Sequence, residues 1–368
     1  MVAGGCSYFD IANMARKSSS LLGLANGVSH QLFHPVPDSA PPYPAKRHTK
    51  ISVVGAGNVG MAIAQTILTQ HLVDELALVD RKADMLRGEM LDLQHAAAFL
   101  PHTRILSSTE LDVTAGSDIC IITAGVRQMP GETRLNLFQR NLALFKQIVP
   151  PVARHSPDAL LLVVSNPVDV LAYIAWKLSG FPSNRVIGSG TNLDSSRLRF
   201  QLAQRLQVNA QDVQAYMVGE HGDGSIALWS SISVGGVPIG LGHLANGKKT
   251  AEAAEELEEI RKSVVDGAYE VIYLKGYTSW AIGYSVADLV RSLVRDLHRV
   301  HPVSLLAKGS YGIPEDREVF LSLPAKLGSS GVLGVANLEL TEEEEKRLRS
   351  SADTLWEMQQ QLDLKVKS

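Results

Sequence analysis

The chain has 368 residues, enough for two domain-sized units, and its 45% hydrophobic and 20% charged residues are ordinary for a globular protein. A net charge of -3 provides no basic field, so we expect no nucleic-acid partner. No apolar stretch reaches the roughly 20 residues that cross a bilayer, so the sequence predicts no membrane span or membrane partner.

Residues 1–49 differ in composition from the rest. They contain three consecutive serines at 18–20, a proline-rich piece at 35–44 and a basic end at 46–50, which is typical of a flexible N-terminal arm. A transit peptide is the alternative, but Asp10 and the low arginine content argue against it. Only two cysteines occur, and Cys120 reads as a small core residue, so we expect a reducing, cytoplasmic location.

The first ordered pattern is a β-branched run at 51–54, which leads into Gly55-Ala-Gly-Asn-Val-Gly60 and a helix expected at 61–69. Further strands are expected at 75–80, 118–123 and 160–165, with helices at 136–149 and 168–179 between them. Continuously apolar strands that alternate with helices indicate a parallel sheet covered on both faces. The sequence therefore predicts an α/β protein with a Rossmann-type, doubly wound parallel sheet over residues 50–190.

The pattern changes after about residue 190. Helices are expected at 194–206, 251–275 and 278–294, and short strands near 227–233, 303–306 and 319–323, the last two as antiparallel hairpins. A capping box from Thr341 to Glu344 begins a C-terminal amphipathic helix. Residues 191–368 are therefore predicted to form a mixed α+β catalytic domain that binds the substrate.

The glycine-rich turn after the first strand predicts a dinucleotide site. Gly55 allows a tight turn, Gly57 lets the backbone approach a pyrophosphate, and Gly60 lets helix and strand pack closely. Asp80 ends the next strand, where a carboxylate accepts from a ribose 2′-hydroxyl and repels a 2′-phosphate. NAD is thus favoured over NADP, the alternative being that Asp80 merely begins a turn.

Three residues supply a carboxylate, a cation and an imidazole. Asp194 and Arg197 lie three apart on one predicted helix, and His221 lies between glycines in Gly219-Glu-His-Gly-Asp223. Hydride transfer to a 2-oxo acid needs a proton donor, an orienting carboxylate and a guanidinium for the substrate carboxylate. By local sequence alone, a surface ion pair and a structural histidine remain alternatives.

A Gly- and Pro-containing segment at 123–136 follows a predicted strand, at the end of the sheet where ligands bind in such folds. Arg127 and Arg134 make it a candidate lid, in which Arg134 would stabilise negative charge on a carbonyl oxygen. A solvated loop with ordinary surface arginines is the alternative.

Over about residues 48–365 the chain resembles the lactate/malate dehydrogenase family, and within it the L-lactate dehydrogenases of the plant branch. The resemblance rests on the order and spacing of these motifs: 54–60, 123–128, 131–136, Ser165-Asn-Pro-Val-Asp169, 185–190, 192–197, 219–223 and 275–283. It implies reversible hydride transfer between NADH and pyruvate, giving L-lactate and NAD, in a homotetramer of fermentative anaerobic glycolysis. No metal is implied.

The resemblance also implies residue roles. His221 is the proton donor and acceptor oriented by Asp194, while Arg134 polarises the substrate carbonyl. The implied substrate-binding residues are Arg197, Gln128, Asn166 and Thr278. The implied cofactor-binding residues are Gly55, Gly57, Asn58, Val59, Gly60, Asp80, Arg127, Asn166 and Ile282.

Gln128 determines the substrate that the resemblance implies. Malate enzymes place an arginine there, whereas a neutral glutamine suits the methyl group of pyruvate. A malate or broader 2-hydroxy acid dehydrogenase and a catalytically silent NAD-binding protein remain alternatives. Two positions depart from relatives: Gly224 replaces a serine and could loosen the His221 loop, and Gln214 replaces a histidine used for activation by fructose bisphosphate, so no such activation is expected.

Overall fold

Parallel strands form one half of a mixed sheet in the computed structural model, which describes residues 32–35, 48–100, 103–126, 134–239 and 250–361. Their order is β4-β3-β2-β5-β6-β7, the doubly wound arrangement. The bounds are β2 Lys50–Val54, β3 Glu75–Val79, β4 Arg104–Ser108, β5 Ile119–Ile122, β6 Leu160–Val163 and β7 Val186–Gly188. The four strands expected from the apolar runs are confirmed, while β4 and β7 were not predicted.

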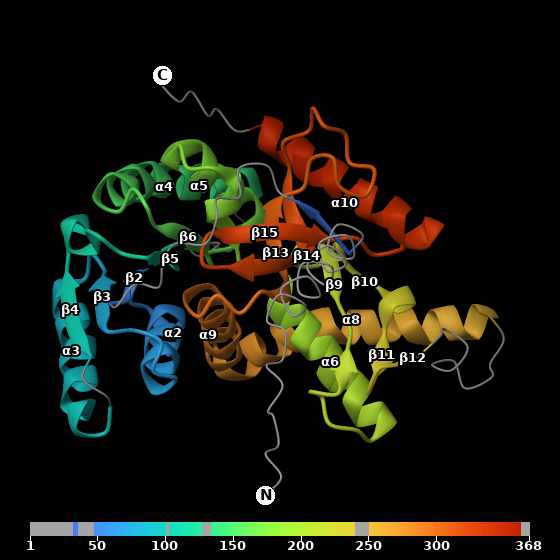
Figure 1. The fold of residues 1–368 in the computed structure, drawn as a ribbon, viewed down its shortest axis with the longest axis horizontal. Coiled ribbons are helices and arrows are strands. Elements are labelled where there is room, and N and C mark those ends of the chain that lie inside the picture. Colours follow the sequence, from blue (N-terminus) through green and yellow to red (C-terminus); the bar gives the residue numbers. More distant parts are fainter. Residues whose placement is uncertain (1–31, 36–47, 101–102, 127–133, 240–249, 362–368) are drawn as a thin grey trace, which may run out of the picture.

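Helices cover both faces of these strands, which explains why the strands lack polar alternation. Figure 1 shows α4 (Arg134–His155) and α5 (Val168–Ser179) on one side and α2 (Asn58–Thr69) with α9 (Trp280–Val294) on the other. Helix α3 (Ala83–His95) packs along β4 at the edge. Short 3-10 turns lie at Ala96–Ala98, Leu111–Thr114 and Ser183–Arg185.

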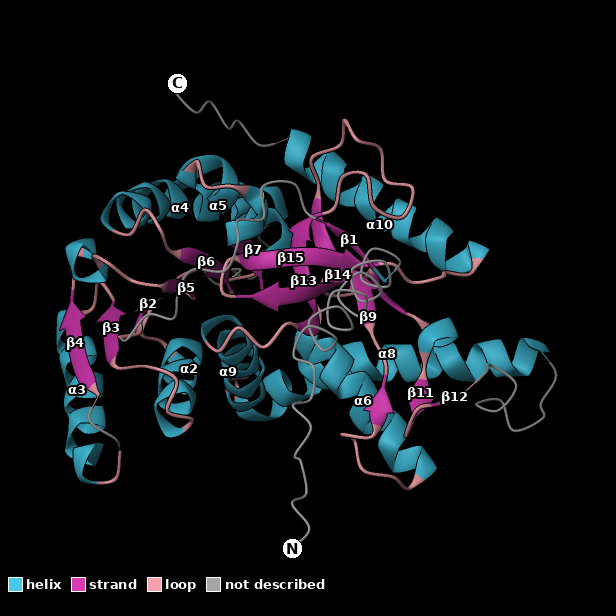
Figure 2. Ribbon diagram, viewed as in Figure 1, coloured by secondary structure: helices cyan, strands magenta, loops and turns pink. Residues whose placement is uncertain are grey.

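The antiparallel strands extend the same sheet (Figure 2). β13 (Arg299–Leu306) pairs with β14 (Phe320–Gly328), which pairs with β15 (Gly331–Ala336). The predicted hairpin strands are confirmed. β13 also joins the parallel half, because Ser304 lies opposite Gly188 of β7.

The remaining elements surround this junction. They are α6 (Asn192–Leu206), β8 (Val213–Gln214), β9 (Met217–Gly219), β10 (Ser225–Ala227), β11 (Ser233–Val234), β12 (Val237–Pro238), α8 (Thr250–Lys275) and α10 (Glu342–Gln360). The capping box of α10 forms as predicted. The strand expected at 227–233 is wrong in its middle, where Trp229–Ser231 forms a 3-10 turn: both the backbone and the hydroxyl of Ser230 donate to the carboxylate of Glu344 in α10.

A short piece of the N-terminal arm departs from the expected flexible segment. β1 (Phe33–Pro35) pairs antiparallel with β15 and so satisfies backbone groups at that edge of the sheet. Residues 1–31 and 36–47 of the arm lie outside the described residues. Within the described ranges, none of the helices is both long and apolar enough to span a bilayer.

Candidate active site

The glycine-rich turn follows β2 and begins α2. Gly55 has φ +108°, and a Cβ there would lie 2.6 Å from the Ala124 nitrogen. A Cβ on Gly60 would lie 1.8 Å from the Gly55 oxygen, so neither position tolerates a side chain. By contrast, Gly57 is exposed and a Cβ on it would meet nothing within 4 Å, which leaves the start of α2 open to a ligand.

Asp80 lies beside this turn. Its Oδ2 accepts from the Ala56 N–H at 2.9 Å and its Oδ1 from the Lys82 N–H at 3.0 Å, so the carboxylate is fixed at the end of β3. The first turn of α2 carries no acidic residue, and its N–H groups suit a phosphate. This open helix start with a fixed, half-buried carboxylate fits a dinucleotide with a free ribose 2′-hydroxyl.

The structure brings Asp194, Arg197 and His221 together. His221 Nδ1 lies 2.6 Å from Asp194 Oδ2, and Arg197 Nη1 donates to Asp194 Oδ1 at 2.8 Å. The Asp194 side chain is only 8% exposed, against 25% for His221 and 21% for Arg197. The surface ion pair is therefore the wrong interpretation, because Asp194 is a buried carboxylate shared by an imidazole and a guanidinium.

The pair shifts both pKa values. Burial opposes the charged imidazolium, but the charge and hydrogen bond of Asp194 outweigh burial and raise the pKa of His221. Burial likewise opposes the charged carboxylate, yet His221 and Arg197 together lower the pKa of Asp194. Such a histidine can hold a proton near neutral pH and release it to a neighbouring oxygen.

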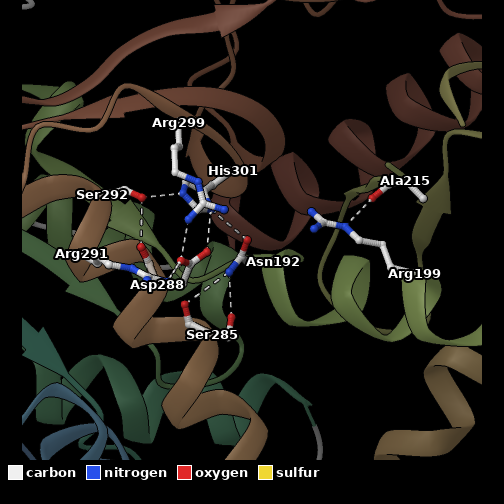
Figure 3. A network of polar contacts seen from close by, with 9 residues as sticks. All are labelled: Asn192, Arg199, Ala215, Ser285, Asp288, Arg291, Ser292, Arg299 and His301. Atoms are coloured by element: carbon white, nitrogen blue, oxygen red, sulfur yellow. Dashed lines mark hydrogen bonds and ion pairs between the residues drawn. The ribbon is translucent and has the colours of Figure 1, made fainter. Parts of the chain in front are cut away.

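A second polar network fixes the start of α6, which carries Asp194 (Figure 3). Asn192 Nδ2 donates to Ser285 Oγ of α9 at 2.8 Å, and its Oδ1 lies 3.4 Å from His301 Nδ1 of β13. His301 Nε2 lies 2.8 Å from Ser292 Oγ, and the residue is 3% exposed. The network thereby joins α6, α9 and β13, and sequence reasoning did not find it.

Because His301 is buried, we expect the free energy of unfolding to depend on pH. Burial lowers its pKa to about 4 from the ordinary 6.5; the nearby Asp288 opposes this shift, and Arg299, Arg199 and Arg291 support it. Because the folded protein favours neutral His301, its contribution to stability is present above pH 6.5 and is lost as the pH falls toward 4. On the order of 3 kcal/mol is at stake. Urea unfolding of His301→Asn should therefore change less between pH 7 and pH 5 than that of the parent; an equal change would contradict this.

The backbone at His221 is fixed by a residue to which the sequence analysis assigned no role. The His221 N–H donates to Asp169 Oδ2 at 2.8 Å, and Asp169 is 2% exposed at the start of α5. Burial raises the pKa of Asp169, against the hydrogen bonds of Ser304 and the His221 backbone. The position of Asp169 at the end of the motif 165–169 was the sequence signal that could have identified it.

A cavity of about 900 Å³ connects the glycine-rich turn with the histidine. The predicted residues that line it are Gly57, Asn58, Val59, Gly60, Asn166, His221 and Thr278. Asp169 lines it as well, as do the apolar side chains of Ile272, Leu355 and Met358. One space thus reaches both the open start of α2 and the imidazole.

The other predicted residues lie elsewhere. Asp80 accepts a hydrogen bond from the turn at Ala56, Gly55 lies within the turn against Ala124, and Ile282 on α9 packs against the core. Arg127 and Gln128 lie outside the described residues. Arg134 is the first residue of α4, and the position of its side chain is likewise not described.

Family models match both halves of the chain. The NAD-binding domain of lactate/malate dehydrogenase matches residues 49–188, and the α/β C-terminal domain of the same family matches residues 191–363. The chain belongs to the lactate/malate dehydrogenase family. The glycine-rich turn and the Asp194–His221 pair lie in the first and second matched domain, respectively.

Relatives within the lactate/malate dehydrogenase family are similar over nearly the whole chain. L-lactate dehydrogenase A of Hordeum vulgare is 67% identical over 95% of this chain and 99% of its own length. L-lactate dehydrogenase of Zea mays is 62% identical over 95% of this chain and 100% of its own length. The L-lactate dehydrogenase A chain of Caiman crocodilus apaporiensis is 55% identical over 86% of this chain and 94% of its own length. The predicted resemblance, including its plant-like character, is confirmed.

Proposed function

We propose that the chain is an NAD-dependent L-lactate dehydrogenase. The observation that carries the proposal is the buried Asp194 carboxylate, which binds Arg197 and also His221, a residue that lines the cavity reaching the dinucleotide turn. The names of the similar relatives from barley, maize and caiman support it.

In pyruvate reduction, His221 supplies the proton. Asp194 keeps a proton on Nδ1, so the opposite nitrogen, Nε2, donates its own to the carbonyl oxygen of the substrate as that oxygen becomes a hydroxyl. His221 is then neutral, and in the reverse direction it accepts the hydroxyl proton of lactate. NADH, when bound, supplies the hydride that adds to the carbonyl carbon.

Arg197 is proposed to bind the substrate carboxylate. Its Nη1 is held by Asp194, which orients the planar guanidinium for paired hydrogen bonds. We assign Arg134 to polarising the carbonyl, and Asn166 and Thr278 to the walls of the pocket. Cofactor contacts are proposed for the turn at 55–60 and for Asp80, Arg127, Asn166 and Ile282.

Three finer parts of the proposal, the location, the oligomeric state and the pathway, rest on the family resemblance. We propose a cytoplasmic homotetramer that acts in anaerobic glycolysis and fermentation. The division into residues 50–190 for the cofactor and 191–368 for the substrate is likewise proposed, and the change from parallel to antiparallel pairing after β7 supports it.

Gln128 gives the test of substrate choice. The parent should turn over pyruvate with a kcat/KM about 10²- to 10³-fold above that for oxaloacetate, because a second carboxylate would be desolvated without a cation. Gln128→Arg should reverse or strongly reduce this preference. A parent that prefers oxaloacetate would make it a malate dehydrogenase, and a folded parent that binds NADH without turnover would make it a silent binding protein.

A further inference from the structure

His221 lies in the loop between β9 and β10, and the first half of this loop is firmly attached. The Glu220 N–H donates to Ser351 Oγ of α10 at 2.8 Å, and the His221 N–H donates to Asp169 at 2.8 Å. The second half contains two glycines, Gly222 with φ +122° and Gly224. Two glycines so close to the histidine give this half high backbone freedom.

Arg261 of α8 contacts the second half at two points. Its Nη1 donates to the backbone oxygen of Asp223 at 3.1 Å and to that of Ser225 at 3.2 Å. These two carbonyls lie on either side of Gly224. Arg261 Nη1 therefore bridges the two carbonyls that flank Gly224, a residue with no side chain of its own to support the loop.

Glu258 holds the guanidinium in place. Arg261 Nε and Nη2 donate to Glu258 Oε1 at 3.0 and 2.7 Å, one turn earlier on α8, and the Arg261 side chain is only 15% exposed. Nη1 of Arg347 in α10 contacts the same carboxylate at 3.5 Å. Tyr269 adds a second contact from α8, donating to Asp223 Oδ1 at 3.2 Å. Helix α10 thus holds the first half of the loop, and helix α8 holds the second half.

We propose that Arg261 is a positioning residue for His221. By fixing the carbonyls around Gly224 it restricts the loop and keeps the His221 ring aligned with Asp194 and with the substrate. The proposal rests on the proposed dehydrogenase function for its effect on rate, but not for its effect on the loop. The freedom that Gly224 introduces is removed here by a side chain from another helix.

Arg261→Ala tests the proposal, with Arg347→Ala as the matched control. In the protein without substrate, hydrogen–deuterium exchange at residues 219–225 should become about tenfold faster in Arg261→Ala, since hydrogen bonds to a charged donor are lost. The kcat for pyruvate should fall about tenfold, with unchanged NADH affinity, and the fall in rate at high pH should begin at lower pH. Arg347→Ala should match the parent in all of these measurements. Arg261→Gln, which keeps most of the stem, replaces the alanine variant if that variant does not fold.

Gly224→Ala provides the rescue. The φ of Gly224 is outside the left-handed region, and a new Cβ would lie 2.3 Å from Glu220 Oε2 and 3.4 Å from Glu220 Cβ, so the Glu220 carboxylate has to shift to admit it. Alanine narrows the backbone freedom, so Arg261→Ala/Gly224→Ala should recover part of the lost protection and rate, provided that Gly224→Ala alone matches the parent. Unchanged exchange in Arg261→Ala, equal effects in Arg347→Ala, or no recovery in the double variant would overturn the proposal. A parent without turnover would instead refute the proposed function, and the exchange data would still test the loop.

Discussion

Asp194→Asn is expected to lower the kcat for pyruvate reduction about 10³- to 10⁴-fold while NADH affinity stays unchanged. The carboxylate lies 2.6 Å from His221 Nδ1, where it fixes the tautomer and stabilises the imidazolium. An asparagine has the same shape but carries no charge, and its amide favours the wrong tautomer. Stopped-flow measurement of NADH oxidation and fluorescence titration of NADH check both parts.

The pH profile makes this expectation sharper. In the proposed mechanism pyruvate reduction needs protonated His221, so we expect full activity below the pKa of His221 and a loss of activity as the pH rises through that pKa. Asp194 helps to raise that pKa, so in Asp194→Asn the loss must begin at lower pH. Asp169→Asn is the comparison, since it changes a nearby buried carboxylate but keeps an acceptor for the His221 N–H. Equal losses in both variants would show that charge near the ring, and not the Nδ1 contact, controls the rate.

Arg197→Ala is expected to raise the KM for pyruvate about 10²- to 10³-fold, because the proposed charge pair between Arg197 and the substrate carboxylate is lost. The NADH affinity should not change, since the cofactor turn lies between β2 and α2 and does not include Arg197. Arg197→Lys should recover only part of the loss, because an ammonium lacks the planar fork of the guanidinium.

The alanine variant also removes the Arg197 contact with Asp194. Thermal unfolding and the His221 pH profile show whether the Asp194–His221 pair is still intact. With an intact pair, an unchanged KM for pyruvate would remove Arg197 from the substrate site.

Much of the fold and the site could be predicted because both depend on local patterns. The strand at 51–54, the glycines after it and Asp80 are adjacent elements of one βαβ unit, whose geometry is fixed by short connections. Asp194 and Arg197 share a face because they lie three apart on a helix. Such local patterns can be recognised without knowing how the rest of the chain folds.

Long-range contacts could not be predicted. Nothing around Arg261 or Ser351 indicates that two distant helices meet at the His221 loop, and the Asn192–His301 contact joins residues 109 positions apart. The turn at 229–231 was missed because its cause, Glu344, lies far along the chain. These contacts depend on tertiary packing, which composition and periodicity do not encode.

The Ser304–Gly188 pairing constrains how the enzyme can move. Enzymes that close like jaws bend at flexible linkers between two separately folded lobes. Here backbone hydrogen bonds run from the parallel strands through β7 into β13, so a hinge motion between the two halves would break the β7–β13 pairing. The continuous ladder therefore fixes the distance between the glycine-rich cofactor turn and the His221 loop before any ligand binds.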